Sequence, residues 1–208
     1  MEGTGARTGA NEDELLKRLL ARDESVFLVL VERHHEGLKR VALTFVRSPS
    51  VADDVVQDTW RAFLEGLETF EKRSSLKTFL YRILSNIART RAVRDQRSTN
   101  ESELESSDDA SPLADRFGTE GTWLAPPTAW SAKTADAILE RKQAMEQLQR
   151  ALEQLPGRQR GVVQLRDVEG LSSEEVCALL DVSEVHQRVL LHRARTKLRA
   201  ALEAHFRG

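Results

Sequence analysis

Apolar residues recur every three or four positions along almost every patterned stretch of this 208-residue chain. Leu76, Leu80, Ile83 and Ile87 show the spacing. It is the period of an amphipathic α-helix, and no clear strand alternation accompanies it. The pattern predicts an all-α fold, and aromatic residues at only 5% of the chain suit small helical bundles.

Breaks in this pattern divide the chain into two small helical domains. Residues 12–97 carry four helical stretches, enough for one bundle. Residues 98–136 are rich in Ser, Asp, Glu, Gly and Pro, which predicts a flexible linker without a packed core. Residues 1–11 predict a disordered tail, and the helical pattern resumes over residues 137–208.

The second domain contains signals for two consecutive helices. Ser172 and Glu175 have the spacing of a capping box, which predicts a short helix ending at Leu180. Ser183 is a suitable N-cap for a last helix running to about Ala204. Two helices joined by about three residues, the second of them basic, predict a helix-turn-helix.

Basic residues gather in two blocks, although the formal net charge of the chain is only −2. Eight basic residues and one acidic residue lie from Lys72 to Arg97. Five basic residues and no acidic residue lie from Gln187 to Arg199. Two such blocks, separated by an acidic connector, predict two places where the chain can hold phosphate groups.

Other residue types exclude several classes of protein. Cys177 is the only cysteine, which excludes an internal disulfide and a cysteine-rich zinc site. The histidines form no metal-binding pattern, and no phosphate loop, nucleophile elbow or close carboxylate pair is present. We therefore expect no metal, no cofactor and no catalytic site. Without a long apolar run or a secretory pattern, we expect a cytoplasmic protein with no membrane contact of its own.

Three blocks of sequence, in this order, resemble the extracytoplasmic-function (ECF) sigma factors of the sigma-70 family. Residues 51–59 resemble the polymerase-binding helix of region 2. Residues 74–83, with Asn86, resemble the loop and helix for the −10 promoter element. Residues 155–160, 165–172 and 191–195 resemble region 4. The resemblance implies a region 2 bundle and a region 4 helix-turn-helix that binds the −35 element.

The resemblance also implies the function and the partners. Such a protein binds core RNA polymerase and directs promoter-specific transcription initiation; it is not an enzyme. Promoter DNA and an anti-sigma factor are its other expected partners.

A helix is expected to begin at Val51, after the break formed by residues 48–50. Val56, Trp60, Phe63 and Leu67 share one side of it and predict its buried face. The opposite side is polar, which alone indicates an ordinary solvated surface. The resemblance implies that this side contacts polymerase through Asp53, Asp54, Gln57, Asp58 and Arg61.

Candidate residues for the −10 element surround the following loop and helix. Basic side chains supply phosphate contacts, and Asn86 offers a donor and an acceptor to a base edge. Phe79 and Tyr81 are either stacking platforms or core residues, with equal weight. The full set is Phe70, Lys72, Arg73, Lys77, Tyr81, Asn86 and Arg89.

Candidate residues for the −35 element lie in the helix that follows Ser183, whose first half is expected in the major groove. Gln187 suits adenine and Arg188 suits guanine. His192 and Arg193, one turn later, are better placed for the DNA backbone. The set is Ser183, Gln187, Arg188, His192 and Arg193.

Two other classes of protein remain as alternatives. A stand-alone helix-turn-helix regulator would bind operators tightly without polymerase, typically as a dimer. A helical adaptor that sequesters an anti-sigma factor would not need the basic −10 helix or Arg188. The acidic helix and the asymmetric two-module layout favour the sigma factor over both.

Overall fold

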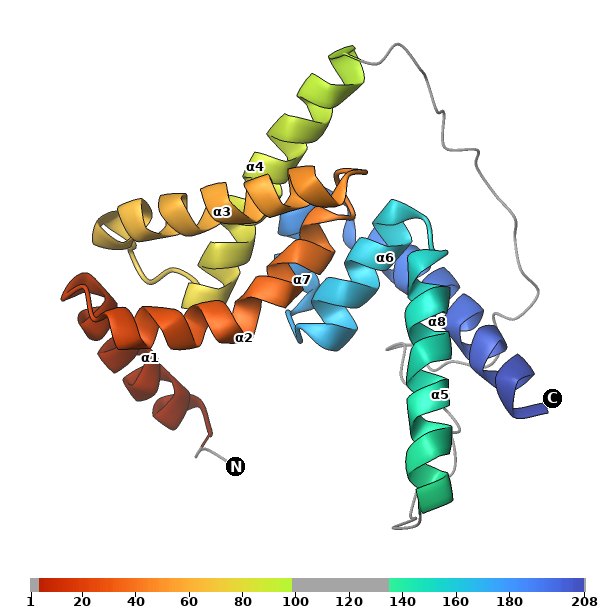
Figure 1. Cartoon of the computed structure of the whole chain (residues 1–208). Coiled ribbons are helices and arrows are strands. Elements are labelled where there is room, and N and C mark those ends of the chain that lie inside the picture. The colour runs from red at the N-terminus through yellow and green to blue at the C-terminus, as the bar shows by residue number, and fades with distance from the viewer. Residues whose placement is uncertain (1–3, 99–134, 208) are drawn as a thin grey trace. The chain divides into compact units, whose positions relative to one another are not determined.

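The computed structural model describes residues 4–98 and 135–207, with side chains over residues 12–94 and 143–204. Every regular element in these ranges is a helix, which confirms the expected all-α class (Figure 1). Most of the expected linker lies outside the described residues. The helices are α1 (Thr4–Leu20), α2 (Glu24–Ala42), α3 (Pro49–Gly66), η1 (Leu67–Thr69), α4 (Leu76–Ser98), α5 (Ala135–Glu153), α6 (Gly157–Val163), η3 (Gln164–Val168), α7 (Ser173–Leu180) and α8 (Glu184–Arg207).

The chain divides into two compact units. The first unit combines residues 1–101 with residues 164–181, and the second combines residues 102–163 with residues 182–208. The division differs from the one expected along the sequence, because residues 164–181 group with the N-terminal helices. This segment contains η3 and α7.

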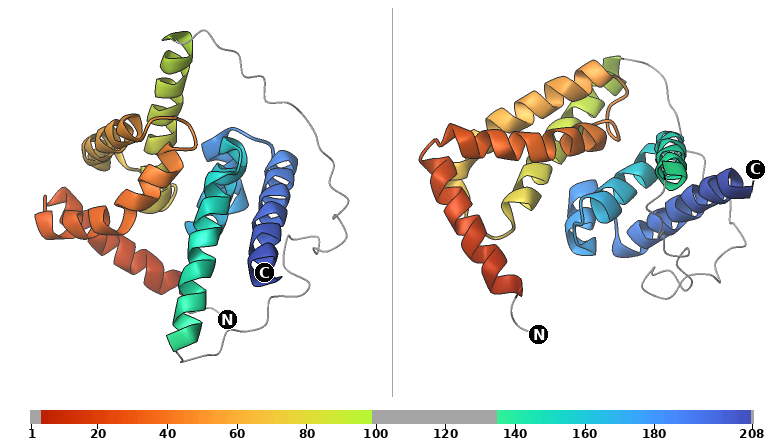
Figure 2. Two further views of the ribbon diagram at one scale, coloured as in Figure 1. Left: turned by 45° about the vertical axis from the view of Figure 1, so that its right-hand side comes forward. Right: turned by 60° about the horizontal axis from the view of Figure 1, so that its bottom comes forward.

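The first unit is built on α2, α3 and α4. Helices α2 and α3 run antiparallel, and α4 crosses both (Figures 1 and 2). Val56, Trp60, Phe63 and Leu67 are all buried, which confirms the expected inner face of α3. They are joined in the core by apolar side chains of the neighbouring helices, among them Leu38, Val41, Leu80 and Leu84.

Two helix starts lie earlier than the sequence predicted. Helix α3 begins at Pro49 rather than at Val51. Proline suits the first position of a helix, because its fixed φ is helical and its missing N–H has no helical partner there. Helix α1 begins at Thr4, inside the expected tail. Extending a helix that has already formed requires only one residue to be fixed per new hydrogen bond.

The turn between α1 and α2 is closed by Asp23. Its carboxylate accepts hydrogen bonds from the N–H groups of Ser25 and Val26 and caps α2. The Arg18 guanidinium binds the same carboxylate, at 2.7 and 2.9 Å. Hydrogen bonds from Ser25 and Arg18 lower the pKa of Asp23 to about 2.

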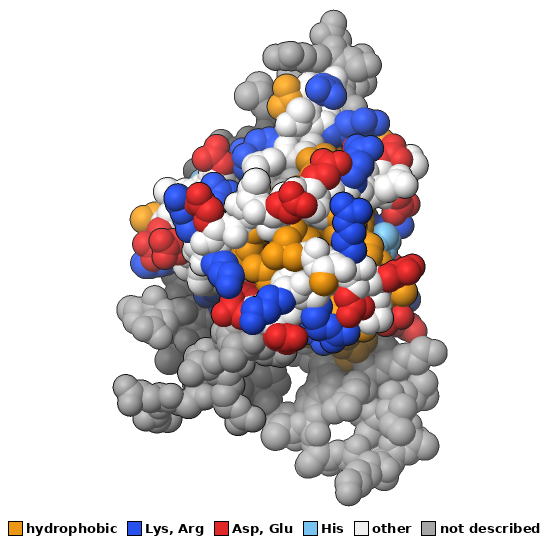
Figure 3. All heavy atoms as spheres, turned by 90° about the vertical axis from the view of Figure 1, so that its left-hand side faces the viewer, with side chains coloured by type: hydrophobic (Ala, Val, Ile, Leu, Met, Phe, Trp, Pro, Cys, Tyr) orange, Lys and Arg blue, Asp and Glu red, His pale blue; other side chains and the backbone are white. Residues whose placement is uncertain are grey.

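A chain of aromatic rings runs through the first unit. Successive ring centroids lie 5.6, 6.0, 5.8 and 4.8 Å apart. Offset and edge-to-face contacts at these distances stabilise aromatic pairs beyond the area that they bury. Figure 3 faces the end of the unit where α3 leads into the loop before α4, and hydrophobic side chains gather there within a ring of charged ones. The rings are, in order, Phe27, Trp60, Phe63, Phe79 and Phe70.

Segment 164–181 begins with a π-turn. The Glu169 N–H donates to the Gln164 carbonyl at 2.9 Å, a span of five residues. Gly170 follows with φ of +69°, a left-handed conformation that favours glycine. The expected capping box is confirmed, since Ser172 and Glu175 exchange hydrogen bonds at the start of α7.

The second unit is built on α8, which packs against α5 and α6; α5 and α8 lie side by side (Figure 2). Leu155, Val162 and Ala194 are among its buried residues. The Ser183 hydroxyl accepts a hydrogen bond from the His186 N–H at 3.2 Å, which confirms Ser183 as the N-cap of α8.

Candidate protein- and nucleic-acid-binding surfaces

The outer side of α3 presents charges that are already paired within the unit. Asp53 lies 2.6 Å from Lys39 of α2, and the nearest oxygen of Asp54 lies 3.8 Å from Arg91 of α4. Arg61 binds Asp58 at 2.7 Å. Exposed pairs of this kind contribute about 0–1 kcal/mol each, so a partner of complementary charge can replace them at little cost.

One apolar residue on this side was missed by the sequence analysis. Leu64 is 43% exposed and follows Gln57 and Arg61 at spacings of seven and three residues. This spacing puts it on the same helical stripe and was visible in the sequence. An apolar side chain among charges gives a docking partner a group to bury.

The loop before α4 is held by acidic residues of α1. Lys72 has φ of 56°, and its ammonium binds the carboxylate of Asp13. The hydrogen bond and the charge of Lys72 lower the pKa of Asp13. The Glu12 carboxylate accepts the N–H of Leu76 and so caps α4. Arg73 is strongly exposed and pairs only locally, with Glu71 at 2.7 Å.

Helix α4 separates the candidate −10 residues by exposure. Asn86 is exposed, whereas Tyr81 is fully buried. Burial is the main cause of the raised pKa of Tyr81, and the charge of Glu169 adds to it. Of the two readings of Tyr81, the structure therefore favours a core residue over a stacking platform. Tyr81 shares the stripe of the buried Leu84 and Ala88, a spacing to which the equal weighting in the sequence analysis gave no preference.

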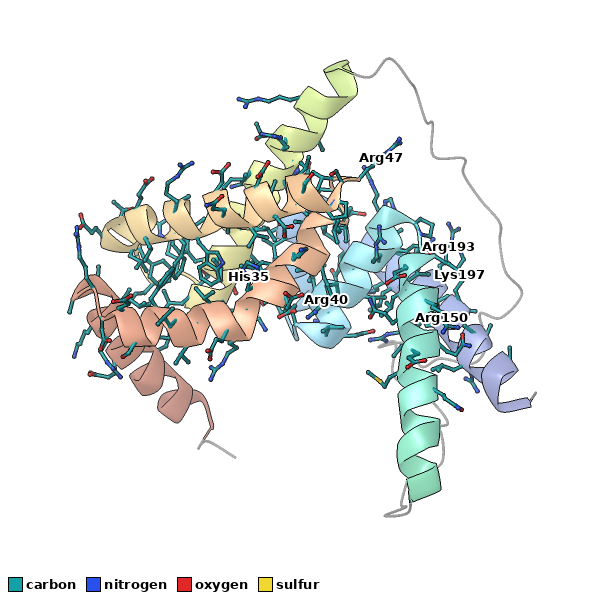
Figure 4. All side chains as sticks on the ribbon, in the orientation of Figure 1. His35, Arg40, Arg47, Arg150, Arg193 and Lys197 are labelled. Atoms are coloured by element: carbon teal, nitrogen blue, oxygen red, sulfur yellow. The ribbon has the colours of Figure 1, made fainter. Side chains whose placement is uncertain are left out.

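A socket for the carboxylate of Glu169 lies between α2 and α4. The side chain is only 9% exposed, and one of its oxygens lies 3.2 Å from the Lys77 ammonium. The other accepts a hydrogen bond from Gln164 at 3.2 Å and lies 4.0 Å from Arg40 (Figure 4). Tyr81 lines the inner end, and the Lys77 ammonium also lies 5.9 Å from its ring centroid.

Gly37 makes the room for this socket. A Cβ at this position would lie 2.5 Å from a Glu169 carboxylate oxygen and 2.6 Å from the Tyr81 hydroxyl. A glycine inside a helix costs about 1 kcal/mol relative to alanine. The glycine at position 37 therefore leaves the space in which the Glu169 carboxylate lies. His34, one turn earlier, is buried, and its desolvation lowers its pKa.

The first turns of α8 expose a different set of residues from the one expected. Gln187 is 2% exposed and lies on the stripe of the buried Leu190 and Leu191. Arg188 is exposed and pairs with Glu184 of the preceding turn. Val185, 70% exposed, and Val189 flank Arg188.

Gln187 therefore does not lie on the exposed face that was expected to read bases. The two valines were missed, although Val185 lies three residues before Arg188 and four before Val189, which makes it a helical neighbour of both. Apolar side chains of this kind can contact the methyl group of thymine. His192 and Arg193 are half-buried, and Arg193 and Lys197 leave α8 one turn apart (Figure 4).

Among the described residues, no three His, Cys, Asp or Glu side chains are grouped so that they could hold a metal ion. None of the described helices combines the length and apolar character needed to span a membrane.

Comparison with known proteins identifies two family matches. Residues 30–99 match Sigma-70 region 2, and residues 145–198 match Sigma-70, region 4. The ECF RNA polymerase sigma factor SigM of Mycobacterium tuberculosis H37Rv is 30% identical over 196 residues, covering 94% of this chain and 87% of SigM. The ECF RNA polymerase sigma-E factor of Escherichia coli K12 is 26% identical over 181 residues, covering 87% and 88% of the two chains.

Solved structures share the fold. CnrH, determined with the cytosolic domain of CnrY, has a TM-score of 0.51 and 24% identity, covering 93% of this chain and 97% of its own. The sigma factor RpoE of Bartonella quintana, determined with the anti-sigma factor NepR, has a TM-score of 0.54 and 21% identity, covering 85% and 96%.

Proposed function

We propose that different helices of this chain bind core polymerase and the two promoter elements. The premise is that the chain belongs to the extracytoplasmic-function sigma factors of the sigma-70 family. Its function is therefore to bind core RNA polymerase and direct transcription initiation at specific promoters. The relatives are regulatory subunits, and we assign no catalytic step to this chain. Its place of action is the cytoplasm, where polymerase and promoter DNA meet.

Core polymerase is assigned to the outer side of α3. Asp53, Asp54, Gln57 and Asp58 supply polar groups for this contact, with Arg61 beside them. Support comes from their lying within the region 2 match, opposite the buried face of the helix. Charge complementarity there sets register and association rate more than affinity.

The −10 element is assigned to the loop before α4 and to α4 itself. Phe70, Lys72 and Arg73 lie in the loop, where strong exposure of Arg73 and the partly exposed Phe70 ring support contact with an opened strand. Exposed Asn86 is the candidate for a base edge. Lys77 and Arg89 are phosphate-binding candidates, and Tyr81 acts from the core by supporting Lys77.

The −35 element is assigned to the start of α8. Arg188 is the base-reading candidate, because an arginine can bind guanine through two hydrogen bonds. Ser183 fixes the start of the helix, and His192 and Arg193 are candidates for the phosphate backbone. Gln187 would need a side-chain rearrangement to reach a base, given its burial.

An anti-sigma factor is the proposed regulatory partner. The sigma factor of similar fold from Bartonella quintana was determined with its anti-sigma factor NepR. The exposed apolar side chains Leu28 and Val29 of α2 offer such a partner an additional surface.

The observation that carries the proposal is the order of two basic helices: α4 lies within the region 2 match, and α8 begins within the region 4 match. The test is run-off transcription with core polymerase on a promoter library, with and without this protein. Initiation at a defined −35/−10 pair should depend on the protein. The double variant Asp54→Arg/Asp58→Arg should abolish it.

The matched control is Glu32→Arg/Glu36→Arg, which makes the same charge change on the exposed side of α2. It should retain initiation. Tight operator binding by the protein alone, without any polymerase-dependent transcript, would instead indicate the stand-alone helix-turn-helix regulator.

A further inference from the structure

Three polar contacts join segment 164–181 to α4 within the first unit. The donors on α4 are Lys77, Thr78 and Arg89, and the acceptors are Glu169, Glu175 and the Leu179 carbonyl. These contacts extend along α4 from its first turn to its fourth. They hold the segment along the helix assigned to the −10 element.

The first contact is the ion pair between Lys77 and Glu169, whose carboxylate lies in the socket beside Gly37. A nearly buried carboxylate is stable only when opposite charges and hydrogen bonds replace its water. Glu169 has both, from Lys77 and Arg40 and from Gln164. The Lys77 ammonium also donates to the backbone carbonyl of Glu169, so one cation holds two oxygens of this residue.

The second contact links Glu175 to α4. The Thr78 hydroxyl donates to one carboxylate oxygen at 2.5 Å, and the Ser172 N–H donates to the other at 2.8 Å. Burial opposes ionisation of Glu175, yet these hydrogen bonds keep its pKa below the usual value. The capping residue of α7 is thus also the residue that ties α7 to α4.

The third contact closes the far end of the segment. The Arg89 guanidinium donates to the Leu179 carbonyl at 2.9 Å. Leu179 lies in the last turn of α7, where carbonyl groups lack helical partners and the helix dipole is negative. A cation is therefore well placed there.

The residues held in these contacts overlap the candidate −10 set. Lys77 and Arg89 are the phosphate-binding candidates of α4, and both have an acceptor from segment 164–181. Carboxylate and phosphate oxygens are equivalent ligands for such cations and compete for them. Asn86 and the loop residue Arg73 are exposed, and Arg73 pairs with Glu71 of its own loop.

We propose that segment 164–181 is a latch, in which Glu169 occupies the position of a promoter phosphate and must leave its socket before α4 can bind the −10 strand. The latch rests on the assignment of α4 under the proposed function. The ligand of the socket is the chain's own Glu169 in the closed state and a nucleic-acid phosphate in the open state.

The test compares binding of a labelled, mixed-sequence single-stranded DNA oligonucleotide by full-length variants without polymerase. Glu169→Gln removes the charge that fills the socket, and Gly37→Ala fills the socket with a methyl group. The matched control is Glu174→Gln, an equal charge change on the exposed side of α7.

Glu169→Gln should bind the DNA about five-fold tighter than wild type or more, because the closed state lowers the apparent affinity. Gly37→Ala also displaces the carboxylate but narrows the socket for a phosphate, so its affinity should lie between those of wild type and Glu169→Gln. Glu174→Gln should stay within two-fold of wild type, a change of about 0.4 kcal/mol. Equal affinities for Glu169→Gln and Glu174→Gln would overturn the latch. If Gly37→Ala fails to fold, as judged by circular dichroism, the Glu169 and Glu174 pair still decides.

Hydrogen exchange gives a second readout that does not depend on DNA. The amides of residues 173–180 should exchange faster in Glu169→Gln than in Glu174→Gln, and unchanged exchange would argue against the latch. Run-off transcription by the wild-type protein separates the two proposals. Initiation combined with unchanged DNA binding by Glu169→Gln rejects the latch alone, whereas absent initiation rejects the sigma assignment.

Discussion

Helices α4 and α8 are both basic and both assigned to promoter DNA, yet their candidate residues differ in availability. On α4, Lys77 and Arg89 are engaged by acceptors from segment 164–181. On α8, Arg188 is exposed and pairs with Glu184 of its own helix. The comparison shows that the candidate residues of the two helices must give up different contacts before they bind promoter DNA. On α4, Lys77 and Arg89 must first lose tertiary contacts, whereas Arg188 of α8 has an exposed ion pair within its own helix to exchange.

The largest expected difference between the helices concerns their packing. Leu80 of α4 is almost fully buried, so Leu80→Ala should lower the free energy of unfolding by about 2–5 kcal/mol. Val189 of α8 is exposed, and Val189→Ala should change it by less than about 0.5 kcal/mol. Urea denaturation followed by circular dichroism measures both. Similar losses in the two variants would show that the start of α8 is packed as tightly as α4.

A smaller effect is expected on DNA binding by the free protein. Arg188→Ala should weaken binding to a −35 duplex by about 1–3 kcal/mol, because it removes a bidentate base contact. Lys197→Ala, which removes an exposed cation farther along α8, is the control and should weaken binding uniformly across sequences. Fluorescence anisotropy with specific and scrambled duplexes separates the two effects. Equal loss on both duplexes would make Arg188 a phosphate contact.

The smallest effects concern the N-caps of α7 and α8. Ser172→Ala and Ser183→Ala each remove a hydroxyl that caps a helix, at a cost of about 1 kcal/mol. Ser172→Ala should have the larger effect, because Ser172 belongs to a capping box whose Glu175 also binds α4. Thermal unfolding ranks the two variants. The reverse order would mean that α7 is held mainly by other contacts.

The fold could be predicted largely because its signals are local. The inner stripe of α3, the capping box at Ser172 and the N-cap at Ser183 each depend on residues within one or a few turns. The start of α3 was misplaced by two residues, because Ser48-Pro49-Ser50 was taken as a break when Pro49 is the first helical residue. Turn residues can begin an element as well as end one.

The candidate sites were less predictable, because they depend on contacts between distant residues. Lys77 and Glu169 lie 92 positions apart, and no spacing rule relates them. The burial of Gln187 was within reach, since it shares a stripe with Leu190 and Leu191. The resemblance to a recognition helix outweighed that pattern. Tyr81 was left undecided for a similar reason: an aromatic ring on a helix serves either role, and only its neighbours decide.

The π-turn at Gln164–Val168 makes the segment after it sensitive to length. A π-turn holds one residue more than an α-helical turn, and each residue of an α-helix rotates the chain by about 100°. Deleting a single residue there would let an ordinary helix form while turning Glu169 away from Gly37 and Lys77. A one-residue deletion at this turn differs from any substitution, because it rotates the residues that follow about the helix axis without removing any of their side chains.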